Sequence, residues 1–491
     1  MNQNEIQQPD EAVLADLQKQ PLIFMRLAEN ALTVAESFRD NYLKNTATFI
    51  SALRRSIKQV RAEPIMTIRQ IENAEWSEVS GEVVTFIDGG VGRVQLSSQV
   101  PILLRVGSYC VKTGERNLAE REQFGYYPVI LGDLEGGSKD RKDFVDIVRI
   151  TAELLGGLAA LERTPNLRVL MFHGPLVYLM SAYAGHTPFT EKDIDVFLAH
   201  YAPGIEKARE LKESFLQEAN VNIYRKMTDR AHKWIENRVF EPMAWIAFLY
   251  NRLITEAKRR NPVPIICGAV ERGGTLREFS EKILLDRIFR SLWEKGDGDY
   301  FNRIYGRTDL TAPKPFLDKL GYTDAILLSM LLQPSQASES WEIDKYSGLR
   351  GGRISMPTEA GTDSADFSVL KPNNDFGFPL VRGCYVRVTE TSDPIRVETF
   401  ADLGEEQITE AARRVYLYSR LLPGYGFPVG LDVADKYAKV PNWMTDAYAK
   451  LIKLHLGISL QKGEISDKQM REILIQSIYM TQRDWLFRPP I

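Results

Sequence analysis

The segment from Glu82 to Val111 constrains the fold most, because its apolar residues follow strand-like rather than helical spacing. It reads as three strands, EVVTFID, VGRVQLSS and PILLRVGSYCV, and Asp-Gly-Gly is a turn signal between the first two. A polar stretch, a helix from about Phe144 to Arg163 and a buried strand, LRVLMF, follow. This order predicts an antiparallel meander that leads through a helix into a mixed α/β sheet.

Helical patterns surround these strands. Apolar residues at three- and four-residue spacing predict helices from about Asp10 to Glu63, and a charged stretch with few helix breakers predicts a helical arm over residues 184–261. The arm either serves docking or dimerisation or enlarges the core. We expect a helical N-terminal extension over 1–78, a main domain over 79–445 and a C-terminal helical segment over 446–491.

Further strands and helices follow the arm. PVPIICGAVE reads as a buried strand, LGYTDAILLSMLL as a helix, and LVRGCYVRVT and IRVETF as two more strands, with helices from Glu405 onward. Residues 348–375 are rich in glycine and serine and predict a mobile loop. The element order is compatible with a ribonuclease-H-like sheet, although it is not unique to that fold.

Composition excludes several classes of protein. Hydrophobic residues make up 44% of the 491 and charged residues 26%, and no apolar run approaches the roughly 20 residues that span a bilayer. The start of the chain lacks the layout of a secretory signal, so we expect a cytoplasmic protein. The net charge of −3 argues against coating nucleic acid through bulk charge, but the basic segment Tyr42 to Ile65 is either part of a local groove or a solvated helix face.

Other chemistries find no support in the sequence. Cys110, Cys267 and Cys384 are far apart in apolar stretches, which predicts buried free thiols rather than a disulfide or zinc site. No phosphate-binding loop, nucleophile elbow or dinucleotide fingerprint occurs, so the chain itself is not expected to use ATP. A glycosidase with two carboxylates has no supporting arrangement of residues.

Two carboxylates are candidates for chemistry. Asp88 ends an apolar strand, where an ionised group needs a cation or donors, but Asp-Gly is also a hairpin signal. Glu153 shares the polar side of its helix with Asp146, which favours a solvated side chain. Gly156 and Gly157 in the same helix predict that another element approaches closely there.

His173 and Asp435 are the other two candidates. His173 ends the strand LRVLMF, and ligand sites in open sheets collect at such strand ends. A single histidine can equally be hydrogen-bonded structure. Asp435 lies one turn after Asp432 in a helix that opens at Phe427-Pro428, where the helix dipole also favours acidic residues.

Taken in order, these segments resemble the NurA nuclease family. FIDGG at Asp88 is similar to the family's strand ending in Asp-Gly-Ser, Glu153 to its helical glutamate, and MFHGPL to its strand ending in Asp-Gly-(Ser/Pro)-Leu. PIICGAVE, YTDAILLSMLL and VRGCYVRVTETSDPIRVE correspond to later family elements. The stretch from Phe427 to Asp435 resembles the family's Tyr-Pro-x-x-Leu-x-x-Ala-His. The resemblance covers roughly residues 80 to 445.

Three positions depart from the family pattern. His173 stands where the family has aspartate, Asp435 where it has histidine, and Phe427 where it has tyrosine, with Tyr425 two residues away. The first two departures together look like an exchange, which would keep three carboxylates and one imidazole. The resemblance therefore implies one Mn²⁺ or Mg²⁺ site formed by Asp88, Glu153, His173 and Asp435.

The resemblance also implies an activity and partners. It implies metal-assisted hydrolysis of phosphodiester bonds at DNA ends, as a 5′-to-3′ exonuclease or a single-strand endonuclease, in repair or in defence against foreign DNA. Arg93 and Tyr425 are candidate substrate contacts, and a HerA-type hexameric ATPase and a second copy of the chain are the implied partners. The alternative is an inactive NurA-like subunit that binds DNA within a HerA-type complex.

Overall fold

A computed structural model gives the structure of the chain and describes most of its 491 residues. The described residues are 21–59, 66–71, 75–94, 102–131, 138–177, 189–201, 205–222, 240, 242–271, 276–343, 353–358, 361–366 and 379–479. The chain forms two compact units: a helical unit, Met1–Thr67 with Arg277–Leu331, and a sheet unit, Ile68–Leu276 with Leu332–Ile491. These boundaries differ from the sequence-based division, because residues 277–331 group with the N-terminal helices.

The helical unit has an aromatic core. The ring centroid of Phe49 lies 5.1 Å from that of Phe316 and 5.6 Å from that of Tyr322, and Thr46 shares a hydrogen bond with the Tyr322 hydroxyl. Its described helices, two of them short π-helices, are α2 (Pro21–Ser37), η1 (Phe38–Leu43), α3 (Lys44–Gln59), η6 (Ser280–Leu285), α10 (Asp286–Glu294), α11 (Tyr300–Tyr305), α12 (Pro313–Leu320) and α13 (Asp324–Leu331).

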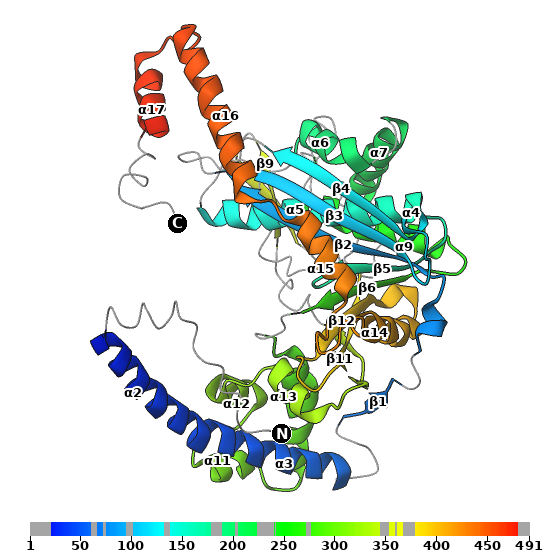
Figure 1. Ribbon diagram of the computed structural model, residues 1–491, viewed down its shortest axis with the longest axis vertical. Helices are drawn as coiled ribbons and strands as arrows, with labels where there is room; N and C mark the ends of the chain where they lie inside the picture. The colour runs from blue at the N-terminus through cyan, green and yellow to red at the C-terminus, as the bar shows by residue number, and fades with distance from the viewer. Residues whose placement is uncertain are drawn as a thin grey trace. The chain divides into compact units, whose positions relative to one another are not determined.

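A ten-stranded mixed sheet forms the centre of the sheet unit (Figure 1). Its described strands are β1 (Ile68–Gln70), β2 (Val83–Arg93), β3 (Ile102–Lys112), β4 (Glu122–Leu131), β5 (Leu167–His173), β6 (Ile265–Val270), β7 (Gln336–Ser338), β8 (Trp341–Ile343), β11 (Val381–Arg387) and β12 (Ile395–Phe400). The order is β1-β7-β11-β12-β6-β5-β2-β3-β4, and β8 pairs with β11. Only the β2–β5 and β5–β6 pairs are parallel. The mixed α/β sheet flanked by helices is therefore confirmed.

Helices cover both faces of the sheet. On one face, Phe86 of β2 packs against Gly430 of α15 (Val429–Ala438) and Tyr418 of α14 (Glu406–Tyr418). On the other face, Ile87 lies beside Gly156 of α5 (Ser138–Arg163). This division follows from the alternation of side chains along a strand, and α15 crosses β2 and β3 as Figure 1 shows.

Strand β2 corrects the predicted turn at Asp-Gly-Gly. It runs unbroken from Val83 to Arg93, and Asp88, Gly89 and Gly90 all pair with β3. The two glycines make room for neighbouring groups: a Cβ at Gly90 would lie 2.6 Å from the carbonyl carbon of Ala438 in α15. The sequence signal for a turn thus marks close packing within a strand.

Two other predictions are wrong in part. The third antiparallel strand is β4, which the sequence analysis did not predict, so the meander is β2-β3-β4 rather than three strands ending at Val111. The predicted loop at 348–375 contains β9 (Arg353–Thr358) and β10 (Gly361–Asp366), which pair antiparallel, while its remaining residues lie outside the described ones. The strands predicted at 167–172, 262–271, 380–389 and 395–400 are confirmed as β5, β6, β11 and β12.

The predicted arm is mostly helical where it is described, and an isolated β-bridge joins Phe189 and Phe240. It contains α6 (Glu191–Tyr201), α7 (Ile205–Asn222) and α9 (Pro242–Lys258). Helix α9 packs on α5, and Trp245 and Leu249 are fully buried, so this part of the arm enlarges the core. The C-terminal helices α16 (Asn442–Gln461) and α17 (Lys468–Tyr479) follow α15, and none of the described helices is long and apolar enough to cross a membrane.

Candidate metal centre

Asp88 lies halfway along β2, between the neighbouring strands β5 and β3. Parallel pairing of β2 with β5 extends as far as Ile87 and Phe172, so Asp88 and His173 are the next residues on two neighbouring strands. The backbone N–H of Gly89 donates a hydrogen bond of 2.8 Å to Oδ1 of Asp88. Asp88 is only 6% exposed, so its second oxygen needs another polar partner.

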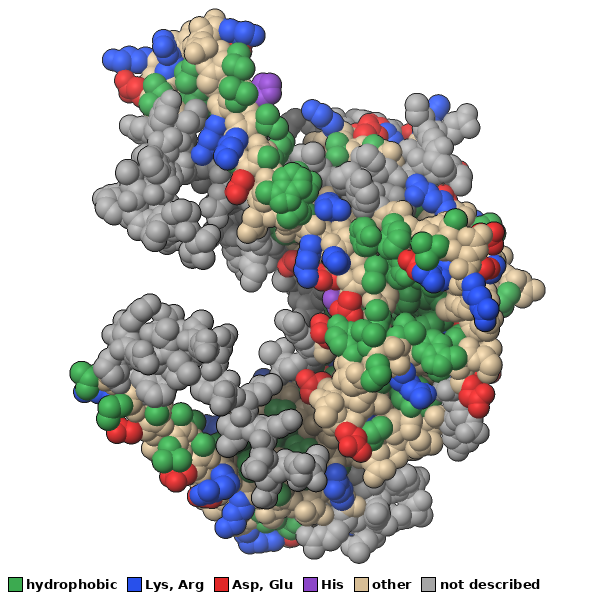
Figure 2. Space-filling view, viewed as in Figure 1, with side chains coloured by type: hydrophobic (Ala, Val, Ile, Leu, Met, Phe, Trp, Pro, Cys, Tyr) green, Lys and Arg blue, Asp and Glu red, His purple; other side chains and the backbone are tan. Residues whose placement is uncertain are grey.

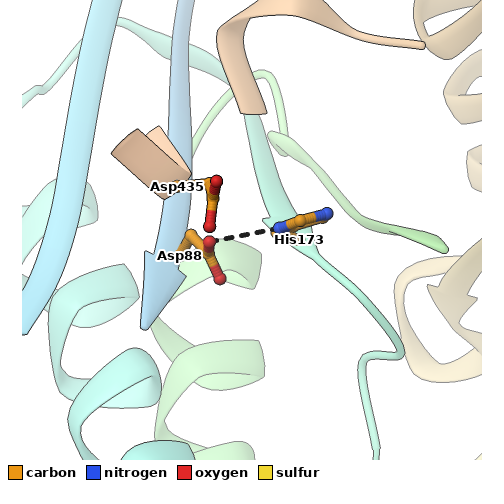
Figure 3. A group of neighbouring side chains, drawn as sticks. All are labelled: Asp88, His173 and Asp435. Carbon is orange, nitrogen blue, oxygen red and sulfur yellow. Dashed lines mark hydrogen bonds and ion pairs between the residues drawn. The ribbon is translucent and has the colours of Figure 1, made fainter. Parts of the chain in front are cut away.

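His173 is that partner. Its Nδ1 lies 3.1 Å from Oδ2 of Asp88, and the imidazole is partly exposed (Figure 3). Burial by itself lowers the pKa of His173, but the hydrogen bond and charge of Asp88, together with Asp435 and Glu271, raise it above its usual value. Without a bound cation, the two carboxylates therefore favour the protonated form of His173.

Asp435 approaches Asp88 and His173 from helix α15, which covers this face of the sheet. The ligand atoms of Asp88, His173 and Asp435 all lie within 4.8 Å of one another, and Figure 3 shows the three side chains converging from two strands and a helix. Oδ2 of Asp435 is 2.6 Å from Nζ of Lys439, one turn further along α15. Two carboxylates and an imidazole that converge in this way form a donor set that suits a divalent cation.

Glu153 lies on the other face of β2. A Cβ at Gly89 would lie 2.8 Å from Cγ of Glu153, so the helix α5 carries this side chain beneath the strand that holds Asp88. Glu153 is 5% exposed and pairs with Arg149 at 3.4 Å, so the prediction of a solvated side chain is wrong. Burial, with a smaller contribution from Asp88, raises the pKa of Glu153 to about 7 despite Arg149. Among the described residues, the converging group does not include Glu153.

The glycines of α5 behave as predicted. A Cβ at Gly156 would lie 2.9 Å from Cγ1 of Val106, and one at Gly157 would lie 2.6 Å from the ring of Phe172. Helix α5 thus lies directly against β3 and β5, and this close approach is what buries Glu153.

The two candidate substrate contacts differ in what can be described. Tyr425 is 44% exposed, and burial and a hydrogen bond with Asp432 raise its pKa to about 12, with Glu271 and Asp435 also contributing. Tyr425 therefore lies in the electrostatic range of the centre. Arg93 lies on β2, five residues after Asp88, but its side chain is outside the described residues.

The sequence analysis missed several charged neighbours of the centre. Lys439 could have been found, because Asp435 and Lys439 have the four-residue spacing of a helical ion pair. Glu271 follows strand β6 just as His173 ends β5, so the same strand-end argument applies to it. Arg149 could not be assigned to Glu153 without knowing which face of α5 is buried.

The cysteines hold no site. Cys267 and Cys384 are buried free thiols, as predicted, and burial raises the pKa of each to about 12. Cys110 is also free but only half-buried.

Comparisons with known proteins gave one family-model match and several similar solved structures. The family model described as the NurA domain matches residues 280–440, a range that contains Asp435 but not Asp88 or His173. No curated protein matches the sequence.

Solved structures of NurA proteins align with most of the chain. The NurA nuclease from Sulfolobus solfataricus is 12% identical, with a TM-score of 0.46, and the alignment covers 88% of this chain and 98% of that one. NurA with manganese is 12% identical (TM-score 0.32; 82% and 96% covered). NurA bound to dAMP and manganese is 13% identical (TM-score 0.27; 86% and 93% covered). The match to the NurA domain model over residues 280–440 is thus the sequence-level similarity of this chain to that family.

Proposed function

We propose that this chain is a metal-dependent deoxyribonuclease of the NurA type, with a ribonuclease-H-like sheet, that hydrolyses phosphodiester bonds at DNA ends. One observation carries the proposal: Asp88, His173 and Asp435 bring their ligand atoms within 4.8 Å of one another. These are the first, third and fourth positions of the ordered resemblance. The exchange of histidine and aspartate thus preserves a compact donor set.

Asp88, His173 and Asp435 are the residues that would hold Mn²⁺, or Mg²⁺ less readily. When bound, such an ion polarises the scissile phosphate and lowers the pKa of a water molecule that attacks it. The N–H of Gly89 fixes one oxygen of Asp88 and leaves the other directed at His173. Only the neutral imidazole of His173 can act as a ligand, and its pKa is raised, so we expect metal binding to release protons.

Glu153 has a supporting role in this proposal. Its carboxyl group lies beside the backbone of Gly89, next to Asp88, and is sheltered from solvent. It adds negative charge close to the centre when it ionises, because its pKa of about 7 lies near neutral pH. Since the converging group does not include Glu153, Glu153→Gln should weaken Mn²⁺ binding only slightly.

The wider setting follows from the family. We propose a cytoplasmic enzyme that works as a homodimer with a HerA-type hexameric ATPase, in DNA end processing or in defence against phage. Tyr425 and Arg93 are proposed contacts to DNA.

An end-labelled DNA assay with Mn²⁺ tests the activity. Wild-type protein should shorten the labelled strand, Asp88→Ala should abolish the cleavage, and EDTA should do the same. Intact DNA with wild-type protein under all metal conditions would overturn the proposal.

One observation favours the inactive alternative, a DNA-binding subunit of a HerA-type complex. Nζ of Lys439 lies 2.6 Å from Asp435 and already supplies a positive charge at the cluster. If Lys439 replaces the cation, Mn²⁺ should not change the melting temperature of wild-type protein, and Lys439→Ala should allow it to do so. The nuclease proposal expects stabilisation by Mn²⁺ in wild-type protein.

A further inference from the structure

A row of aromatic rings, stacked at its two inner contacts and tilted at the outermost one, leads from the core of the sheet unit to its surface. The ring centroids of Phe86 and Tyr109 are 6.1 Å apart, those of Tyr109 and Phe124 are 4.9 Å apart, and those of Phe124 and Tyr437 are 4.7 Å apart. Phe86 is buried, whereas Phe124 is 47% exposed and Tyr437 is 38% exposed. The outer pair thus presents ring surface to solvent while the inner pair fixes its position.

Helix α15 connects this outer pair to the candidate metal centre. Leu431, Ala434 and Ala438 form its buried side. At 100° per residue, Asp435 and Tyr437 fall on opposite flanks of that side, and their contacts agree: Asp435 meets His173 of β5, and Tyr437 meets Phe124 of β4. One helix therefore separates the centre from the rings.

The solvent side of α15 carries positive charge between the two flanks. Lys436 is exposed, and Lys439 is 70% exposed although it pairs with Asp435. Figure 2 shows hydrophobic side chains gathered on this face of the sheet unit, with lysine and arginine side chains around them. Exposed rings beside cations are the combination that binds single-stranded nucleic acid, since bases stack on the rings and phosphates meet the cations.

We propose that Phe124 and Tyr437 form a stacking platform for an unpaired base of a single DNA strand, whose backbone crosses α15 over Lys436 and Lys439 toward Asp88. The proposal rests on the proposed nuclease function for its ligand, and adds that the substrate enters as a single strand. A base inside a duplex is already stacked on both sides and cannot lie on the platform. Packing of β4 against α15 explains why the rings touch, but leaves their exposed surface without a role.

Equilibrium binding in EDTA tests the platform without cleavage. Fluorescence anisotropy would compare a labelled single-stranded oligodeoxythymidine, its duplex and the matching oligouridine. Phe124→Leu keeps an apolar side chain but removes the ring, so it should weaken single-strand binding about tenfold, with little change for duplex. Phe124→Trp should retain the affinity. Trp443→Leu, at a residue 69% exposed on α16, is the matched control and should bind like wild type.

The cations have their own test. Lys436→Ala should lower the slope of log affinity against log salt by about 0.7, the value for one single-strand phosphate. Lys462→Ala, at a lysine 66% exposed, is the control. This variant tests the strand path even if Phe124→Leu unfolds.

The outcomes separate this proposal from the nuclease function. Single-strand binding within twofold of wild type for folded Phe124→Leu, or an equal loss for duplex, would overturn the platform whether or not the protein cuts DNA. A selective loss in a protein that leaves DNA intact with Mn²⁺ would overturn the nuclease function and support the platform. Equal losses for oligodeoxythymidine and oligouridine would support stacking but contradict the restriction to DNA.

Discussion

Acidic groups on the two faces of strand β2 differ in their exposure to solvent and in their partners. On the α15 face, Asp88 meets His173 and Asp435, whose side chains are 23% and 32% exposed. On the α5 face, Glu153 of α5 lies beside Gly89, the residue that follows Asp88 in the strand. Its side chain is 6% exposed and pairs with Arg149. The α15 face is therefore the open face, where His173 and Asp435 remain partly accessible to solvent. The α5 face is the closed face, where the carboxylate of Glu153 is buried and paired with a cation.

This difference teaches how one strand can serve both binding and stability. A cation must enter and leave, so its ligands need access to water. A buried carboxyl group instead needs a paired cation or a proton, and Glu153 has access to both. We therefore expect substitutions on the open face to affect metal binding and those on the closed face to affect folding.

The largest effect is expected for Asp88→Asn. The substitution removes the negative charge at the centre of the site and keeps the shape of the side chain. In wild-type protein, metal at about 100 times its Kd should stabilise the fold by roughly 3 kcal/mol. In Asp88→Asn, Mn²⁺ should no longer raise the melting temperature. Differential scanning fluorimetry with a Mn²⁺ titration measures this. Glu153→Gln serves as the closed-face control and should retain most of the response; the same loss in both variants would contradict the comparison.

The pH dependence of folding should distinguish Glu153. Its pKa in the folded protein is raised to about 7 from its ordinary value of 4.5, so the native state holds the proton more tightly than the unfolded chain. Its stabilising contribution is complete below about pH 4.5 and is lost as the pH rises through 7.

Urea unfolding of metal-free protein measures that loss. At about 1.4 kcal/mol per unit of pKa, wild type should lose on the order of 3 kcal/mol relative to Glu153→Gln between pH 4.5 and 7. The difference between the variants removes the contribution of His173. Parallel curves for wild type and Glu153→Gln would show that burial of Glu153 does not depend on its proton.

A smaller effect is expected where α15 lies on β2. Gly90→Ala places a Cβ 2.6 Å from the carbonyl carbon of Ala438, so α15 must shift, at a cost of roughly 2 kcal/mol. The shift should also weaken Mn²⁺ binding, because Asp435 moves with the helix. Gly457→Ala is the matched control on α16, where a Cβ meets nothing within 4 Å. Wild-type Mn²⁺ affinity in Gly90→Ala would indicate that the position of α15 on β2 does not determine the geometry of the metal site.

The smallest effect is a partial rescue. His173→Asp should weaken cleavage, and adding Asp435→His should restore about tenfold of the loss if both residues serve one centre. End-labelled DNA cleavage by the two single variants and the double variant gives the coupling. Strictly additive losses would place His173 and Asp435 in separate roles.

Local patterns in the sequence determined much of the sheet. Apolar runs predicted strands β5 and β6, because a buried strand with a parallel neighbour needs a nearly continuous apolar segment. Strands β11 and β12 were also predicted, although charged residues interrupt both. The helix opening at Phe427-Pro428 was also predicted from local residues. His173 and Asp435 could be chosen as candidates because each occupies the end of an element or its first turns.

Only the tertiary structure decided where those elements meet. Asp-Gly-Gly reads as a turn, yet β2 continues through it because β3 pairs along its whole length and α15 lies against Gly90. Glu153 reads as solvated, yet close contact of α5 with the sheet buries it. The sequence by itself determined which residues can bind a cation. Packing across β2 decided that Asp88, His173 and Asp435 converge and that Glu153 lies on the opposite face of the strand. The physical reason is that side chains distant in sequence meet only when the sheet and its covering helices assemble.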